Sequence, residues 1–159
     1  KALRALSADI ELPDIASLSI DTIAQRVVRD FNMKTGVVVD LEVPNQHVQA
    51  SLRDKIAIYR VLQESLANIY RHAPNVACHV MLKARANSLI LEISDKGPGF
   101  DPQAALKKKR LGLAGMRQRI EVLGGSFQLI TTLGAGTTVL VTLPIIDIDL
   151  DDDIEDSNE

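Results

Sequence analysis

The chain has 159 residues, of which 46% are apolar, and this length and composition predict one globular domain with its own core. Its single cysteine, Cys78, excludes an internal disulfide and a cysteine-rich metal site. With no tryptophan, two tyrosines and three phenylalanines, the chain offers few rings on which the bases of a single-stranded nucleic acid could stack. We therefore expect no nucleic-acid partner.

The net charge of −3 hides an uneven distribution of charge along the chain. Residues 147–159 hold eight acidic and no basic side chains, which leaves 18 basic and 13 acidic residues in the rest. A mildly basic body suits an anionic ligand such as a nucleotide phosphate. Residues 147–159 are expected to be a disordered acidic tail, because they cannot bury a core.

The sequence favours a cytoplasmic location. No apolar run approaches the roughly 18 residues of a membrane span, and no signal peptide opens the chain. The first residue is Lys1 rather than methionine, so the chain is also compatible with a cytoplasmic fragment of a membrane-bound parent protein. A membrane connection would then run only through other parts of the parent protein.

The first part of the chain is predicted to contain two helices and a strand. Helical spacing of apolar residues over 1–12 predicts a helix that ends at Pro13. A second helix is expected to begin near Ser19 and to end at Gly36. The valine-rich residues 37–43 predict a strand.

A long central helix is predicted over residues 53–72, where apolar residues recur at steps of three or four. Ser51 and Asp54 have the spacing of an N-terminal cap with an acidic third position. Residues 76–84 and 89–94 then read as two strands joined by a polar turn, which predicts an antiparallel hairpin.

The last part of the chain contains a long loop, a helix and a second hairpin. Residues 95–110 include two glycines, two prolines and four consecutive basic residues, so we expect a mobile loop over a site. A helix with one apolar face is expected over 113–123, followed by strands at 127–132 and 137–143. Together these elements predict an α+β fold, a two-layer sandwich whose mixed, mostly antiparallel sheet carries helices on one face.

The central helix has a polar stripe opposite its apolar one. Glu64, Asn68, Arg71 and His72 share this face. The amide oxygen of Asn68 suits Mg²⁺, and the carboxylate of Glu64 could orient or deprotonate a reactant. Arg71 and His72 could reach phosphate oxygens. A solvated surface would show the same pattern, so periodicity alone leaves both interpretations open.

The turn that begins at Asp95 follows an apolar strand directly. Gly97 and Gly99 would let its backbone approach a planar ligand without obstruction by side chains. The carboxylate of Asp95 could accept a hydrogen bond from an exocyclic amino group, such as the one adenine presents. An ordinary Asp-Gly loop is the alternative.

Gly112 and Gly115 open the next helix, whose N-terminal amides and dipole would favour a phosphate. The basic run that includes Lys109 lies beside them in the sequence and suits the same phosphate. The alternative is again simple, because glycines before helices are common and runs of lysine are usually solvated.

The polar face of the central helix, the Asp95 turn and the glycines at 112 and 115 follow one another in a characteristic order. In this order they resemble the catalytic ATP-binding domain of two-component sensor histidine kinases, within the GHKL ATPase superfamily. Residues 63–73 resemble the N box, 95–100 the first glycine box, 112–119 the second and 134–137 the last. The likeness covers residues 19–143 and is greatest to sensor kinases related to nitrate and cell-envelope-stress sensors. It implies a Bergerat-type ATP-binding fold.

The resemblance implies a role for each motif. Glu64 would be the catalytic or orienting carboxylate, and Asn68 would hold Mg²⁺. Asp95 would bind the amino group of adenine. The residues that it implies for nucleotide binding are Asn68, Arg71, His72, Asp95, Gly97, Gly99, Phe100, Lys109, Gly112, Leu113, Gly115, Met116 and Thr137.

The resemblance also implies partners. Such kinases transfer phosphate to a histidine on a separate dimerisation helix pair, typically a histidine followed by an acidic residue, and none of the chain's three histidines has this context. We therefore expect residues 1–12 to be the end of a dimerisation helix or a linker, 13–146 the catalytic domain and 147–159 the tail. The expected partners are the dimerisation domain that carries the acceptor histidine and a response regulator.

Two other functions stay open on the sequence alone. One is a GHKL ATPase of another kind, such as an anti-sigma-factor serine kinase or a fragment of a chaperone or topoisomerase. The other is a regulatory module that holds a nucleotide without turning it over. Phosphotransfer to a supplied dimerisation domain would separate the histidine kinase from both.

Overall fold

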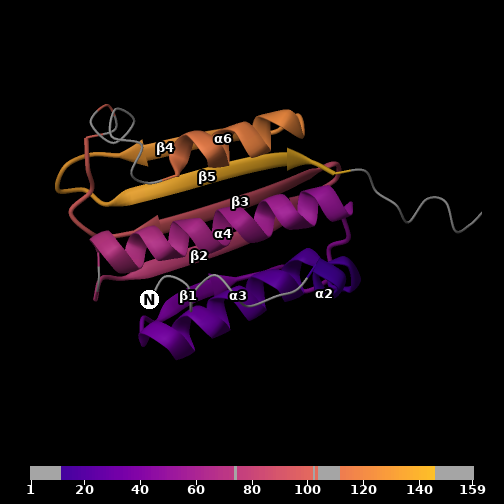
Figure 1. Cartoon of the computed structure of the whole chain (residues 1–159), viewed down its shortest axis with the longest axis horizontal. Helices are drawn as coiled ribbons and strands as arrows, with labels where there is room; N and C mark the ends of the chain where they lie inside the picture. The colour runs from indigo at the N-terminus through magenta and orange to yellow at the C-terminus, as the bar shows by residue number, and fades with distance from the viewer. Residues whose placement is uncertain (1–11, 74, 102, 104–111, 146–159) are drawn as a thin grey trace, which may run out of the picture.

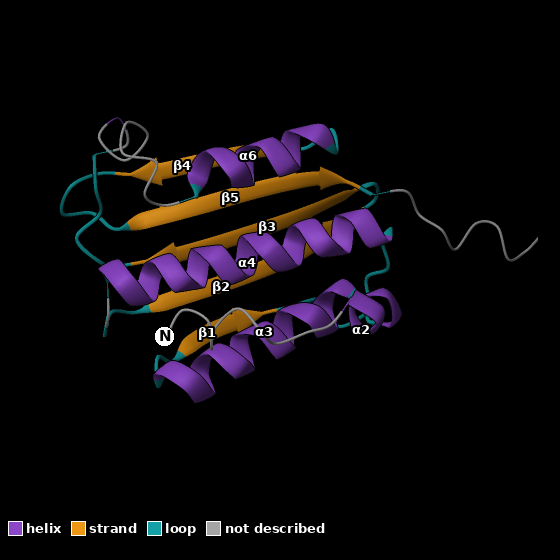
Figure 2. Ribbon diagram, in the orientation of Figure 1, coloured by secondary structure: helices purple, strands orange, loops and turns teal. Residues whose placement is uncertain are grey.

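The computed structural model describes residues 12–73, 75–101, 103 and 112–145, which form two layers (Figure 1). Five strands make one sheet in the order β1-β2-β3-β5-β4, and the helices cover one face of it (Figure 2). The elements are α2 (Leu12–Ser17), α3 (Ile20–Thr35), β1 (Val39–Glu42), α4 (Leu52–His72), β2 (Cys78–Arg85), β3 (Ser88–Asp95), α6 (Leu113–Val122), β4 (Ser126–Thr131) and β5 (Thr137–Pro144). The predicted α+β sandwich is confirmed.

The strand pairings explain why Asp95 lies where it does. β1 pairs in parallel with β2, and α4 makes the crossover that parallel neighbours require. The β2–β3, β3–β5 and β4–β5 pairs are antiparallel. In this register Asp95 lies opposite Cys78 of β2 and Thr137 of β5. The end of β3, the central strand of the sheet, therefore lies beside the start of β5.

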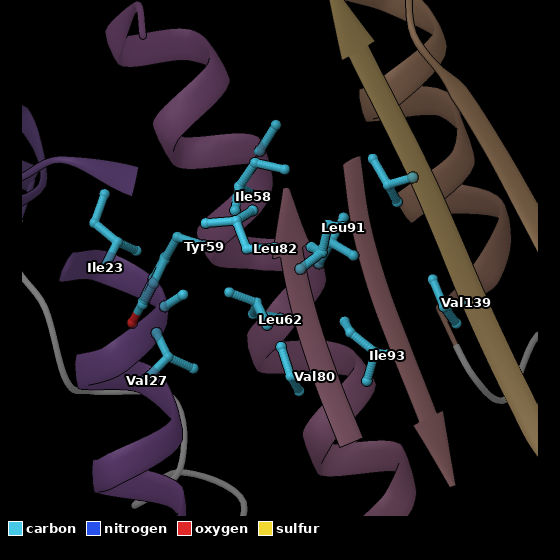
Figure 3. Packing of buried hydrophobic residues seen from close by; sticks show 14 of the residues in the cluster. Ile23, Val27, Ile58, Tyr59, Leu62, Val80, Leu82, Leu91, Ile93 and Val139 are labelled. Atoms are coloured by element: carbon cyan, nitrogen blue, oxygen red, sulfur yellow. The ribbon is translucent and has the colours of Figure 1, made fainter. Parts of the chain in front are cut away.

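The core lies between the sheet and the helices. Alternate residues of β3, such as Leu91 and Ile93, face the helices and are at most 2% exposed. Figure 3 shows Ile58 and Leu62 of α4 packing against Val80 and its neighbours in the sheet. Among the described residues, no helix is long and apolar enough to cross a membrane.

The two long helices begin and end where the sequence predicts. The Ser51 hydroxyl accepts a hydrogen bond from the Asp54 N–H at 3.2 Å, which satisfies one of the free amides at the start of α4. Gly36 follows α3 with φ of 72°, and its N–H donates to the Asn32 carbonyl at 2.8 Å. A residue with a Cβ would be strained in this left-handed conformation.

Two predicted boundaries were wrong. Pro13 does not end a helix but lies in the first turn of α2, where its fixed φ and missing N–H are tolerated. The strand predicted over 37–43 is shorter, because the Val37 N–H bonds to Thr35 Oγ1 at 3.1 Å before β1 begins. Other predictions fall on residues 1–11, 104–111 and 146–159, which lie outside the described residues.

Lys55 fastens α2 to α4. Its side chain is 5% exposed, and Nζ donates a hydrogen bond to the Ala16 carbonyl at 3.0 Å. A buried ammonium group is costly unless an acceptor compensates it, and a carbonyl near the end of a helix carries partial negative charge. The short helix α2 is thereby held against the first turn of α4.

Asp21 fastens the segment before α4 to the start of α3. One of its carboxylate oxygens accepts the Val48 N–H and the other contacts Nδ1 of His47, each at 2.8 Å. Burial alone would raise the pKa of Asp21, but hydrogen bonds from Val48, Ser19 and His47 outweigh it and hold the pKa below its usual value.

We expect Asp21→Asn to lower the free energy of unfolding more at neutral than at acidic pH. Because the folded-state pKa of Asp21 is lowered, its contribution is present above the usual value of 3.8 and is lost as the pH falls through the folded-state pKa. The free energy of unfolding should fall by about 1.5 kcal/mol at pH 7. Urea unfolding at neutral pH and near pH 3 measures both losses. Equal losses at both would contradict a charged role.

Candidate functional site

The predicted site residues that the structure describes gather at one end of the sheet, where β3 ends and β5 begins (left in Figure 1). The turn after β3 meets the turn between β4 and β5 there. The C-terminal half of α4 and the start of α6 lie against each other at the same end, since Glu64 contacts Gly112. Segments that are far apart in the sequence thus form one surface.

Two glycines allow the two turns to touch through their backbones. A Cβ on Gly136 would overlap the Asp95 carbonyl oxygen, and a Cβ on Gly99 would overlap the carbonyl oxygen of Thr132. Both glycines also have positive φ, 79° and 64°. The position of the Asp95 turn therefore depends on glycine at both places.

The hydroxyl of Thr131 joins the same turns. Its Oγ1 accepts the Phe100 N–H at 3.1 Å and lies 3.2 Å from the Gly136 carbonyl oxygen and 3.0 Å from Oγ1 of Thr137. Phe100 and Thr137, both predicted site residues, are thereby fixed beside each other. Thr131 was not predicted, because no local motif marks it and its contact with Phe100 joins residues 31 positions apart.

Asp95 is half-buried at the centre of this end of the sheet. Its Oδ1 accepts the Gly97 N–H at 2.8 Å, which fixes the direction of the carboxylate. A Cβ on Gly97 would come within 2.5 Å of Cβ of Ala73, at the end of α4. Burial raises the pKa of Asp95, although the Gly97 N–H acts in the opposite direction. A partly buried carboxylate whose direction is fixed by a backbone hydrogen bond is typical of a ligand-binding position.

The polar face of α4 presents a preformed pair. Oδ1 of Asn68 accepts a hydrogen bond from Nη2 of Arg71 at 2.6 Å, and Nε of Arg71 lies 3.4 Å from the Ala67 carbonyl oxygen. The amide oxygen predicted to hold a metal is thus beside a guanidinium group. His72, the last residue of α4, is exposed.

Glu64 lies between α4 and α6. Its Oε1 is 3.3 Å from Nη1 of Arg119, and a Cβ on Gly112 would come 2.7 Å from its Oε2. Gly112 is the N-cap of α6, with φ of 63°, and it has no side chain that could accept the first amides of the helix. The carboxylate therefore faces the positive end of α6.

Three further residues of the second glycine box were predicted to bind the nucleotide, and the structure shows where each of them lies. The side chains of Leu113 and Met116 are buried in the core, 7% and 0% exposed, because they continue the apolar face of α6. Their side chains therefore belong mainly to the core. Gly115 has nothing within 4 Å of where a Cβ would stand. Lys109 lies outside the described residues.

Comparison with known families and curated proteins gives consistent matches. The family model for histidine kinase-, DNA gyrase B- and HSP90-like ATPases matches residues 53–147. The chain is 29% identical over 143 residues to the signal transduction histidine-protein kinase/phosphatase DegS of Brevibacillus brevis, covering 90% of this chain and 37% of DegS. It is 28% identical over 145 residues to the oxygen sensor histidine kinase NreB of Staphylococcus carnosus, covering 91% and 42%. The chain thus spans about two fifths of these relatives.

Solved structures share the fold. The histidine kinase domain of the blue-light activated histidine kinase of Erythrobacter litoralis EL346 matches with a TM-score of 0.70 and 20% identity, over 91% of this chain and 71% of that one. The mycobacterial sensor histidine kinase MprB matches with a TM-score of 0.64 and 21% identity, over 80% and 95%. At such identities the likeness concerns the arrangement of helices and strands.

Gly136→Ala and Gly134→Ala form a matched pair that tests the contact between the turns. Both positions have positive φ, 79° and 83°, so either alanine should cost about 1 kcal/mol in backbone strain. Only at Gly136 would the added Cβ meet another segment, the Asp95 backbone, whereas nothing lies within 4 Å of the Cβ position of Gly134, whose N–H still donates to the Pro98 carbonyl. We expect the free energy of unfolding, from urea titration, to fall clearly further for Gly136→Ala. Equal losses would show that the turns do not depend on close contact.

Proposed function

Because the chain belongs to the family of histidine kinase-, DNA gyrase B- and HSP90-like ATPases, we propose that it is the ATP-binding kinase domain of a two-component sensor histidine kinase. It binds ATP in the cytoplasm and donates the γ-phosphate to a histidine on a separate dimerisation domain. An aspartate of a response regulator then receives the phosphate. The observation that carries this proposal is the held carboxylate of Asp95, at the same end of the sheet as Glu64 and Asn68.

Asp95 would recognise the base. Its carboxylate is fixed by the Gly97 N–H and accepts the exocyclic amino hydrogen of adenine. Guanine carries a carbonyl oxygen at the corresponding position, and a carboxylate facing that oxygen would be repelled. The site therefore favours ATP over GTP.

The start of α6 would receive the phosphates. Gly112 leaves the first amides of the helix without a side-chain cap, and these amides together with the helix dipole favour an anion. Arg71, exposed on α4, can add a charge-assisted hydrogen bond. Glu64, which lies against Gly112, is then close enough to orient the acceptor imidazole or to take its proton.

Mg²⁺ fits this site as an ion bound together with the nucleotide. In the described part of the chain, no group of three or more His, Cys, Asp or Glu side chains could hold a metal. Asn68 supplies one neutral oxygen, and Mg²⁺ commonly takes its remaining ligands from phosphates and water. The guanidinium of Arg71 now bonds to that oxygen, so it would move aside and become available to a phosphate. When bound, the ion neutralises phosphate charge.

Asp95→Asn should weaken ATP binding while the fold is retained. An amide replaces the acceptor only in part, and a hydrogen bond to a charged group is worth about 1.5 to 3 kcal/mol, so the Kd should rise by one to two decades. Asp40→Asn, an exposed carboxylate on the edge strand β1, is the control and should bind ATP normally. Isothermal calorimetry measures both. An unchanged Kd for Asp95→Asn would remove this residue from the site.

Asn68→Asp and Glu64→Gln should separate metal binding from transfer. The first adds a charge at the proposed Mg²⁺ ligand and should alter the Mg²⁺ dependence of the Kd for ATP. The second should keep the Kd but lower phosphotransfer to a supplied dimerisation domain by about 100-fold, the contribution of a general base. Labelled ATP and calorimetry give the two readouts. If both variants lost ATP binding equally, this face of α4 would be structural.

A further inference from the structure

The two carboxylate oxygens of Glu64 have different neighbours, one on α6 and the other its N-cap residue. Oε1 pairs with Nη1 of Arg119 at 3.3 Å, while Oε2 lies where a Cβ on Gly112 would come within 2.7 Å. We propose that Arg119 is a positioning residue, which holds Oε1 so that Oε2 is presented at the start of α6. This inference rests on the proposed function, in which Glu64 acts on the acceptor imidazole.

Buried contacts between α4 and α6 surround this ion pair. Gly112, Met116 and Arg119 are four and seven positions apart on α6 and therefore share the face that meets α4. Beside the ion pair, the buried Ser65 hydroxyl donates to the sulfur of Met116 at 3.7 Å. Met116 is itself fully buried. The spacing of the two helices at Glu64 is thus set by the core and not by the ion pair.

The direction of the Arg119 side chain follows from helix geometry. Long side chains on a helix lean toward its N-terminus, so the guanidinium of Arg119 reaches back along α6 to the level of Glu64. There it contacts Oε1, whereas Oε2 is the carboxylate oxygen next to Gly112. The guanidinium of Arg119 therefore engages Oε1, and Gly112 places no side chain next to Oε2.

Stability is a poor explanation for this pair. The two side chains are 47% and 37% exposed, and ion pairs with such exposure contribute little to folding because water screens them. Orientation of a carboxylate is a different matter, since an error of about 1 Å in a reacting group can cost 100-fold in rate. The pair is therefore expected to matter for transfer more than for folding.

Arg117 is a matched control on the same helix. It is exposed, and its guanidinium lies 5.8 Å from the centre of the Phe127 ring. Arg117→Gln and Arg119→Gln remove the same charge from the same helix two residues apart. A difference between them in phosphotransfer reports the contact with Glu64 and not the general charge of α6.

The test measures Kd for ATP and single-turnover phosphotransfer to a supplied dimerisation domain at saturating ATP. Arg119→Gln should keep the Kd within about twofold and lower the transfer rate by about tenfold or more, a part of what a general base supplies. Arg119→Lys should restore part of the rate, because one ammonium replaces the planar guanidinium only incompletely. Arg117→Gln should transfer normally. In a Glu64→Gln background, Arg119→Gln should cause no further loss.

Failure of this inference is distinguishable from failure of the proposed function. If the unchanged chain binds ATP but transfers nothing, the kinase assignment fails, and the role of Arg119 fails with it. If the unchanged chain transfers and Arg119→Gln behaves like Arg117→Gln, Arg119 is not a positioning residue and the kinase assignment stands. If Arg119→Gln lowers the melting temperature much more than Arg117→Gln, or its loss adds to that of Glu64→Gln, its role is structural and the inference is overturned.

Discussion

The site depends on one close approach, between the backbone of the Asp95 turn and the turn that joins β4 to β5. Gly136 meets the Asp95 carbonyl and Gly99 meets the Thr132 carbonyl at separations that leave no room for a side chain. Sheet pairing brings the turns together, because β3 and β5 are neighbours and Asp95 lies opposite Thr137. The backbone of Asp95 is thus held by the sheet itself, and the Gly97 N–H then fixes its carboxylate.

A second constraint comes from α4, which serves the core and the site at once. Its apolar face, with Leu62 and Leu66 at most 1% exposed, is locked against the sheet. Its polar face then has no freedom of rotation, so Glu64 is presented in a fixed direction toward the start of α6, with Asn68 one turn further along the same face. Lys55 extends this rigid body to α2 at the other end of the helix.

The sequence predicted most of the fold, since the signals for its elements are local. A serine with an acidic residue three positions later begins α4, a glycine ends α3, and strict alternation marks the covered strands. The strand before Pro44 was predicted too long, because valine content cannot reveal that the Val37 N–H donates a hydrogen bond to the Thr35 side chain. Pro13 was misjudged because a proline that ends one helix and a proline in the first turn of another look alike in sequence.

The candidate site was predicted less completely, for a related reason. The order of its motifs pointed to Glu64, Asn68 and Asp95, and Asp95 and Asn68 have near partners in the chain, Gly97 and Arg71. Other contacts at this end of the sheet join residues far apart in the chain. Thr131 and Phe100 are 31 positions apart, and Arg119 and Glu64 are 55. The burial of Met116 agrees with the apolar spacing predicted for α6, whereas its part in nucleotide binding stays a prediction.

The most direct measurement is a titration of the isotopically labelled chain with Mg²⁺ and a non-hydrolysable ATP analogue, followed through backbone amide chemical shifts. Binding between the glycine turns and α6 predicts the largest changes at Gly97, Gly99, Gly112 and Gly136. Gly124, which lies beside Pro144 at the opposite end of the sheet, should not change. No change at saturating nucleotide, or changes confined to the groove that Val27 and Tyr59 line between α3 and α4, would contradict a nucleotide site at the Asp95 end of the sheet.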